Sequence, residues 1–170
     1  ILVKIGENYT TSLKEVYGGG NKALVTKNTT KVEVNLYENA TVTNAFNGGN
    51  EAGIEGTQSE TPRAIYAKGA IVTGSLYGGS NSDGPLTETH VYCTEDAVIG
   101  SVYGGGFGEN ATVTGNVLTD STTGEKLPAC NVSINSCLIQ GSVYGGGNAG
   151  EVRGPTDVDI TNSNAVNVYG

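Results

Sequence analysis

The chain of 170 residues repeats one short block, in which an aromatic residue is followed by residues that are mostly glycine. The aromatic residues that open the six copies are Tyr17, Phe46, Tyr77, Tyr103, Tyr144 and Tyr169. Successive copies are separated by 29, 31, 26, 41 and 25 residues. A repeat of roughly 20–50 residues is typical of solenoids, propellers and related arrays, so the block restricts the fold more than any other feature.

Each repeat also contains three short stretches in which apolar and polar residues alternate. One lies well before the block, as in residues 132–134; one leads into the aromatic residue, as in 139–143; one follows the glycines, as in 151–153. Alternation with a period of two is typical of half-buried strands, and Gly and Asn clusters are typical of turns. The composition agrees, because Val, Thr, Ile, Tyr and Asn dominate over the strong helix formers.

Three strands in about 25–30 residues correspond to one coil of a parallel β-helix, whose coils stack and share a core. The predicted fold is therefore all-β: a parallel, right-handed β-helix or β-solenoid with three short strands per coil. A β-sandwich and a propeller are the competing architectures. A propeller blade needs about 40 residues and four strands, and only the repeat that ends at Tyr144 is that long.

The repeat covers the whole chain, so residues 1–170 are interpreted as a single solenoid segment. Two stretches exceed the basic coil and are predicted to be loop insertions: residues 55–62 and residues 118–128. The chain starts at Ile1, stops within a block, and has no leader peptide or long apolar run. We therefore expect a segment of a longer repeat protein, with no membrane-inserted part.

The strand before each aromatic residue predicts which side chains face the core. Counting back in steps of two selects Val102, Gly100 and Val98 in the fourth repeat. The glycine is predicted to mark a bend or a close approach of two backbones. In the second repeat the same count places Val42 outward, and a β-bulge that returns it to the core is predicted there.

The aromatic residues are predicted to form a ladder along one edge, because successive coils lie about 4.8 Å apart. The candidate binding residues are the members of this ladder: Tyr17, Phe46, Tyr77, Tyr103, Tyr144 and Tyr169. Two roles remain open. Each ring covers the glycine-rich turn beside it, or the row of rings is an exposed contact surface for sugars or a second fibre.

The glycines of the block are interpreted as corner residues that supply positive φ. A phosphate-binding loop is disfavoured, because it needs a Lys-Ser or Lys-Thr pair and a following helix. In four repeats the glycines or serine are followed by asparagine: Asn21, Asn50, Asn81 and Asn148. Stacked in register, these side chains are expected to form an amide ladder.

The net charge is −8 at pH 7, from 9 Lys and Arg residues and 17 Asp and Glu residues. Nucleic-acid binding requires clustered Lys and Arg, which the sequence lacks, so no nucleic-acid partner is expected. Attraction to an anionic membrane is disfavoured for the same reason. The acidic residues are interpreted as a solvated coat that limits aggregation of a β-rich surface.

Three cysteines are present, and no pair has the CxxC spacing of a zinc site. Cys93 and Cys137 lie within strand patterns and are predicted to be small, buried side chains. A disulfide between Cys130 and Cys137 is left open. The oxygen-rich stretch 81–84 lacks the tandem repeat of calcium β-rolls, so we expect neither a metal nor a cofactor.

Catalytic residues have little support in the sequence, and the prediction is that the protein is not an enzyme. His90 is the only histidine, is predicted to lie on the outer face of a strand, and belongs to no triad motif. Asp157 and Asp159 are predicted to point outward together, about 6.5–7 Å apart along their strand. That separation overlaps the range of inverting glycosidases, although a solvated acidic face explains it equally well.

The block reads Leu-Tyr-Gly-Gly-Ser-Asn at residues 76–81 and Val-Tyr-Gly-Gly-Gly-Asn at residues 143–148. It resembles the YGGGN-type blocks of large bacterial cell-surface and secreted repeat proteins, which look like adhesin-type parallel β-helices. The resemblance implies an extracellular setting at the bacterial cell surface and carries over no catalytic residue. Phe46-Asn47 and Phe107 depart from the block, so the coils are not equivalent.

The expected function is that of a structural or adhesive module of an extracellular surface protein, with assembly into a filament as one form of it. The expected partners are glycans, host surface proteins or sister copies of the chain. The alternative is a carbohydrate-active β-helix enzyme, a polysaccharide lyase or hydrolase. An ice- or mineral-binding solenoid is disfavoured, because the threonines are not in register between coils.

Overall fold

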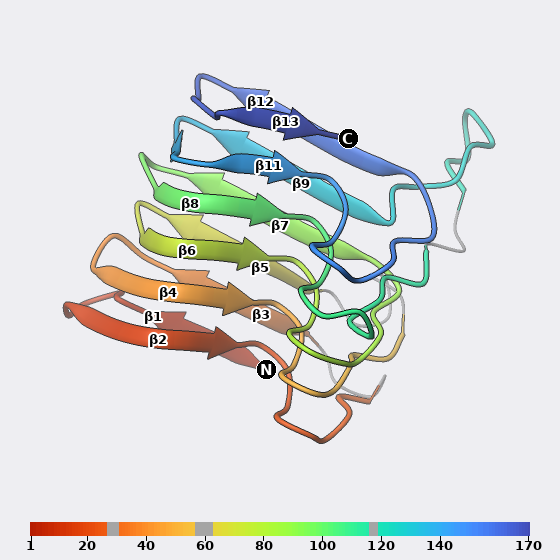
Figure 1. The fold of residues 1–170 in the computed structure, drawn as a ribbon, viewed down its shortest axis with the longest axis horizontal. Coiled ribbons are helices and arrows are strands. Elements are labelled where there is room, and N and C mark those ends of the chain that lie inside the picture. Colours follow the sequence, from red (N-terminus) through yellow and green to blue (C-terminus); the bar gives the residue numbers. More distant parts are fainter. Residues whose placement is uncertain (27–30, 57–62, 116–118) are drawn as a thin grey trace.

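The structure is a computed structural model that describes residues 1–26, 31–56, 63–115 and 119–170, and all regular elements in these residues are β-strands. The strands form two parallel sheets that face each other (Figure 1). Sheet A has the order β1-β3-β5-β7-β9-β12, and sheet B has the order β13-β11-β8-β6-β4-β2, with β10 paired to β8. The predicted all-β parallel solenoid is confirmed.

The strand bounds follow the repeat. Sheet A consists of β1 (Leu2–Ile5), β3 (Val32–Leu36), β5 (Arg63–Lys68), β7 (Thr89–Thr94), β9 (Cys130–Asn135) and β12 (Thr156–Thr161). Sheet B consists of β2 (Thr11–Tyr17), β4 (Ala40–Phe46), β6 (Ile71–Tyr77), β8 (Val98–Tyr103), β10 (Leu138–Ile139), β11 (Ser142–Tyr144) and β13 (Asn167–Tyr169).

The third strand of each coil is reduced to isolated bridges, which in the middle coils include a polar column of Glu51, Asp83 and Asn110. The apolar bridging residues form one parallel column: Val25, Ile54, Leu86, Val113 and Val152. Four of the five are flanked only by Gly, Pro or polar residues, Val25 with Leu24 before it being the exception, so this side of the coil has too little apolar surface for a longer strand. The apolar column closes the interior between the two sheets.

The core lies between the sheets and runs without interruption from coil to coil. On sheet A, Val34, Ile65, Val91 and Val132 occupy one row, and none exceeds 1% exposure. These rows face the buried residues of sheet B within one contiguous cluster. No coil can bury its apolar face alone, so each coil depends on its neighbours.

Irregular register in sheet B confirms one predicted orientation and corrects another. Val42 is fully buried, and the pairing of β4 with β6 shifts between Val42 and Ala45, as predicted for a bulge. In β8, however, Ile99 faces the core and Val98 does not. The prediction for Val98 was wrong because the two core residues of β8, Val102 and Ile99, are three positions apart, so the alternation is broken between them and a step-of-two count from Tyr103 leaves the core face.

The glycines of the block serve close packing between coils, and the prediction of positive φ at these positions was wrong. None of them is among the glycines with positive φ. Instead, a Cβ atom on Gly78 would lie 2.2 Å from the carbonyl oxygen of Gly104, and one on Gly104 would lie 2.2 Å from that of Gly145. Within the described residues, positive φ is found mainly at other turns, such as those at Gly69 and Asp96 that connect sheet A to sheet B.

All three cysteines are buried and free. The buried positions of Cys93 and Cys137 are confirmed. Cys130 begins β9 and Cys137 follows its end, so roughly 16 Å of extended strand separates them. A disulfide requires Cα atoms within about 7 Å, and the Cys130–Cys137 bridge therefore does not form.

Asn47 stands where the five other copies of the block have glycine, and its side chain is fully buried. Neither its amide nitrogen nor its oxygen has a hydrogen-bond partner among the described residues. A buried amide without partners keeps its full desolvation cost, whereas an apolar residue of the same shape does not. Asn47→Leu is therefore expected to raise the free energy of unfolding by about 1 kcal/mol, measured by chemical denaturation. A lower stability than the parent would contradict this.

Candidate functional site

The six aromatic residues of the block form the predicted ladder. They pair in register from Tyr17 through Phe46, Tyr77, Tyr103 and Tyr144 to Tyr169. Successive ring centroids lie 4.6–5.1 Å apart, and the ring planes deviate by only 4–12°. The separation matches the spacing of coils, so each ring stacks directly on the ring of the next coil.

Stacking on both sides leaves the inner rings little surface for a ligand. Phe46 is 2% and Tyr77 is 5% exposed, Phe107 packs edge-on against Tyr77 at 5.7 Å, and Tyr103 and Tyr144 are half-buried. Tyr169, with one stacked neighbour, is 50% exposed. The faces on which a sugar would stack are therefore used by neighbouring rings, which favours the structural role of the ladder over the binding role.

The asparagine after the glycines forms the second predicted ladder in part. The side-chain nitrogen of Asn50 donates to the side-chain oxygen of Asn21 at 2.8 Å, and that of Asn81 donates to Asn50 at 2.7 Å. Phe107 takes the equivalent place in the next coil and interrupts the row. The amide ladder therefore joins the first three coils only.

Alkaline pH is expected to unfold the protein through the tyrosine ladder. Burial, together with the hydrogen bond to Glu15 and its charge, raises the pKa of Tyr17 to about 12, and burial also raises the pKa of Tyr77 and Tyr103. A raised folded-state pKa stabilises the fold below the ordinary tyrosine value of about 10. That stability is lost as the pH rises through about 12, and circular dichroism recorded beside tyrosinate absorbance measures it. Ionisation of Tyr17, Tyr77 and Tyr103 at about pH 10 with the fold intact, measured in a variant whose exposed Tyr9 and Tyr169 are replaced by phenylalanine, would contradict the expectation.

A second group of aromatic side chains lies on the outer face of sheet A, and the sequence reasoning missed it. Tyr66 and Tyr92 stack at 5.0 Å with an interplanar angle of 14°, and Lys68 Nζ lies 4.8 Å from the centre of the Tyr66 ring. His90 lies beside Tyr92, with ring centroids 6.3 Å apart and an angle of 20°. A signal was available, because Tyr66 and Tyr92 precede the aromatic residue of their blocks by the same number of residues.

The lysine of this group is held by polar neighbours as well as by rings. Lys68 Nζ donates to Asn35 Oδ1 at 2.9 Å, and Asn35 Nδ2 donates to Glu33 Oε1 at 3.1 Å. The hydrogen bond from Lys31 is the main reason that the pKa of Glu33 lies below its ordinary value, and Asn35 and Lys68 add to it. Glu33 is therefore a structural anion that orients the amide and the lysine.

The candidate catalytic residues lie on the same outer face. His90 points outward from β7, as predicted, and its Nδ1 lies 3.4 Å from the hydroxyl of Tyr92. Burial, with a smaller contribution from the charge of Arg63, lowers the pKa of His90. Asp157 and Asp159 are both exposed on β12, as predicted, and pair with Asn131 and Ser133 of β9. Sheet register therefore brings the polar outer residues of three coils together.

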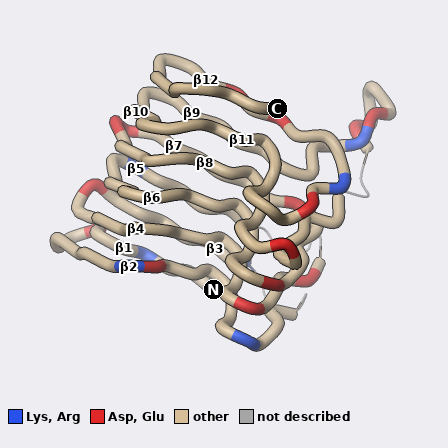
Figure 2. Tube along the Cα trace, viewed as in Figure 1, with Lys and Arg blue, Asp and Glu red and all other residues tan. Residues whose placement is uncertain are grey.

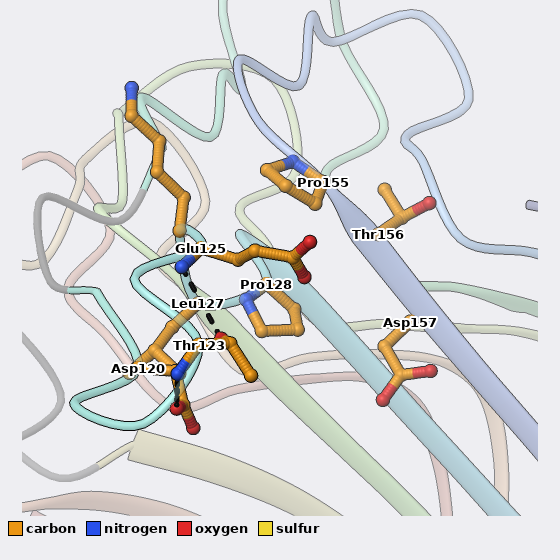
Figure 3. A pocket seen from close by; sticks show the side chains of 9 residues that line it. Asp120, Thr123, Glu125, Leu127, Pro128, Pro155, Thr156 and Asp157 are labelled. Carbon is orange, nitrogen blue, oxygen red and sulfur yellow. Dashed lines mark hydrogen bonds between the residues drawn. The ribbon is translucent and has the colours of Figure 1, made fainter.

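A cleft of about 680 Å³ lies beside Asp157 (Figure 3). One wall is the projecting turn within residues 119–128, where Asp120 Oδ1 accepts hydrogen bonds from the backbone nitrogens of Thr122 and Thr123 at 2.7 and 2.8 Å. The other wall is the start of β12, and the carboxylates of Glu125 and Asp157 border the gap between the walls. Figure 1 shows that this turn stands away from the solenoid. Leu118 and residues 57–62, also predicted as insertion, lie outside the described residues.

Figure 2 shows few charged residues along the strands, and several acidic residues follow one another from coil to coil in the connecting segments on the right of the view. Among the described residues, no group of three His, Cys, Asp or Glu side chains is arranged to hold a metal ion. The described part of the chain also contains no helix that is long and apolar enough to cross a membrane.

Comparison with known proteins found no match: no protein-family model, no curated protein and no solved structure matches this chain.

Proposed function

We propose that the chain is a structural and adhesive module of a bacterial extracellular surface protein. The observation that carries the proposal is the unbroken aromatic ladder from Tyr17 to Tyr169, whose rings stack at every coil of the described structure. In a ladder of this kind, the apolar faces of the rings contact the rings of the neighbouring coils. These contacts support the interpretation of the solenoid as a rod, which holds its loops and the outer faces of its sheets at fixed positions along one axis.

The surface of the rod supports an adhesive role. The turn within residues 119–128 projects from the solenoid, and Asp157 and Asp159 are exposed on the outer face of sheet A. Binding residues are commonly presented in this way by a rigid scaffold. The resemblance of the YGGGN-type blocks to bacterial surface repeat proteins supports the extracellular setting. Glycans, host surface proteins or further copies of the chain are the proposed partners.

Surface labelling tests the proposal. Antibodies raised against this chain are expected to label intact cells of the bacterium that encodes it, and protease added to intact cells is expected to remove the signal. A periplasmic and a cytoplasmic protein serve as controls for cell integrity. Labelling that requires permeabilised cells would overturn the extracellular assignment.

A carbohydrate-active enzyme is the second candidate, and the cleft beside Asp157 is the observation that favours it. Incubation with a panel of polysaccharides, followed by assays for new reducing ends and for unsaturated products, tests it. Under the adhesive proposal neither product forms. Product formation that disappears in Asp157→Asn or Asp159→Asn, with the fold intact, would establish the enzyme instead.

A further inference from the structure

We propose that the outer face of sheet A around Tyr92, together with the cleft beside Asp157, binds a neutral polysaccharide chain. We call this surface the outer strip and define it by one row of Tyr66, Tyr92, Ser133 and Asp159 and a second row of His90, Asn131 and Asp157. The inference rests on the proposed adhesive function and deepens it, because it moves the binding site from the aromatic ladder to another face and names the ligand class.

The stack of rings in the first row stops within the solenoid. Tyr92 stacks on Tyr66 on one side, and on the other side the next residue in register is Ser133. Tyr66 and His90 are the rings that stack on Tyr92 among the described residues, and neither β9 nor β12 contributes an aromatic residue on the other side. Every inner ring of the aromatic ladder has a ring on both sides, so Tyr92 presents what those inner rings lack: a position next in register that holds a small side chain instead of a ring.

His90 widens this platform. It lies two residues from Tyr92 on β7, and its ring is inclined by only 20° to the Tyr92 ring. The next residue in register above His90 is Asn131. The two rings are thus nearly parallel, with centroids 6.3 Å apart, and the next coil carries only an amide and a hydroxyl at the positions in register with them. One coil step of about 4.8 Å is the distance at which the rings of this protein stack, and a pyranose ring fits the same separation.

Polar groups suited to sugar hydroxyls surround the platform. Asn131 donates and accepts, Ser133 does both through its hydroxyl, and the exposed carboxylates of Asp157 and Asp159 accept. Asp157 also borders the cleft, whose volume of about 680 Å³ lies within the usual range of ligand sites. The strip and the cleft therefore form one continuous polar path that begins at an aromatic face.

The charges select among polysaccharides. The cleft is lined by Asp120, Glu125 and Asp157 against a single cation, Lys126, and Asp159 adds a further negative charge on the strip. Like charges brought together cost free energy, so chains of uronate or sulfated sugars are disfavoured. A neutral chain offers hydroxyls to the same carboxylates without that cost.

Affinity electrophoresis of the whole 170-residue chain tests the inference. The gels contain neutral glucan, mannan or xylan, or a polyuronate as the charged comparison. Retardation by at least one neutral polysaccharide and none by polyuronate is expected. Tyr92→Ala is expected to weaken binding by about tenfold, the size of one lost aromatic contact. Retardation by polyuronate alone, or by no polysaccharide, would overturn the inference.

A filled-platform variant separates binding from folding. Ser133→Tyr adds a ring in register with Tyr92, which extends the stack, so the thermal midpoint is expected to stay equal or to rise while polysaccharide binding is lost. Thr161→Tyr adds the same side chain at an exposed position of the neighbouring β12, outside the strip, and is expected to leave binding unchanged. Full binding by Ser133→Tyr, or equal loss in both variants, would refute the site.

The outcomes also separate this inference from the function on which it rests. Absence of binding combined with surface labelling of intact cells removes the outer strip as a glycan site and leaves the surface module. Binding accompanied by cleavage of the polysaccharide retains the site but replaces the adhesive module by the enzyme.

Discussion

Replacing Tyr77 by alanine is expected to lower the free energy of unfolding by about 3–5 kcal/mol, the range of large aromatic truncations in cores. Tyr77 is 5% exposed, its ring stacks on Phe46 at 4.7 Å and on Tyr103 at 4.9 Å, and Phe107 packs against its edge. The truncation therefore removes buried aromatic area and also the partner of two further rings. Chemical denaturation followed by circular dichroism measures the change.

Tyr169→Ala is the matched control, because the same side chain at the end of the ladder has one stacked neighbour and is 50% exposed. Its expected cost is about 1 kcal/mol. A similar loss in both variants would show that stacking within the ladder does not stabilise the solenoid. The structural basis of the proposed rod would then be lost.

The second large effect concerns a glycine rather than a core residue. Gly100→Ala is expected to destabilise the protein by about 3 kcal/mol, or to prevent folding, because the new Cβ atom would lie 2.1 Å from the carbonyl oxygen of Gly74 in the neighbouring coil. A backbone carbonyl cannot rotate to another rotamer as a side chain does, so the coils that contain Gly74 and Gly100 must separate locally. The yield of folded protein and the denaturation midpoint measure the effect.

Gly146→Ala provides the control for this substitution. A Cβ atom on Gly146 meets nothing within 4 Å, and Gly146 is not among the residues with positive φ. The expected change is within about 0.5 kcal/mol, and its sign is towards stabilisation, since alanine restricts the unfolded chain more than glycine does. Equal destabilisation by both substitutions would show that the loss of glycine flexibility, and not a steric clash between coils, is the reason that alanine destabilises the protein at these positions.

Repetition explains why so much of the fold and of the ladders was predictable. A residue type that recurs at one place in every coil must lie in one row once the coils stack in register, and this argument applied to Tyr77 and Tyr103 and to Asn21 and Asn50 alike. It needs no knowledge of distances. Alternation counted back from Tyr103 was wrong at Val98, because the buried residues Val102 and Ile99 of β8 are three positions apart.

The glycines and the outer strip show what a single-coil argument misses. Positive φ is a property of one residue in its own turn, whereas the contact between Gly78 and Gly104 exists only between coils. The face of Tyr92 is likewise defined by Ser133, which is distant in sequence and adjacent in the sheet. Neither relation is visible until the register is known.

The sequence by itself determined the coil, the alternating stretches that form its strands and the order in which like residues stack, because these depend on alternation and on a repeat that can be counted along the chain. The tertiary structure alone decided how closely the coils approach and which rings keep an open face. Those properties arise from atoms of different coils meeting across a few ångströms, and the spacing of residues along one strand does not contain that information.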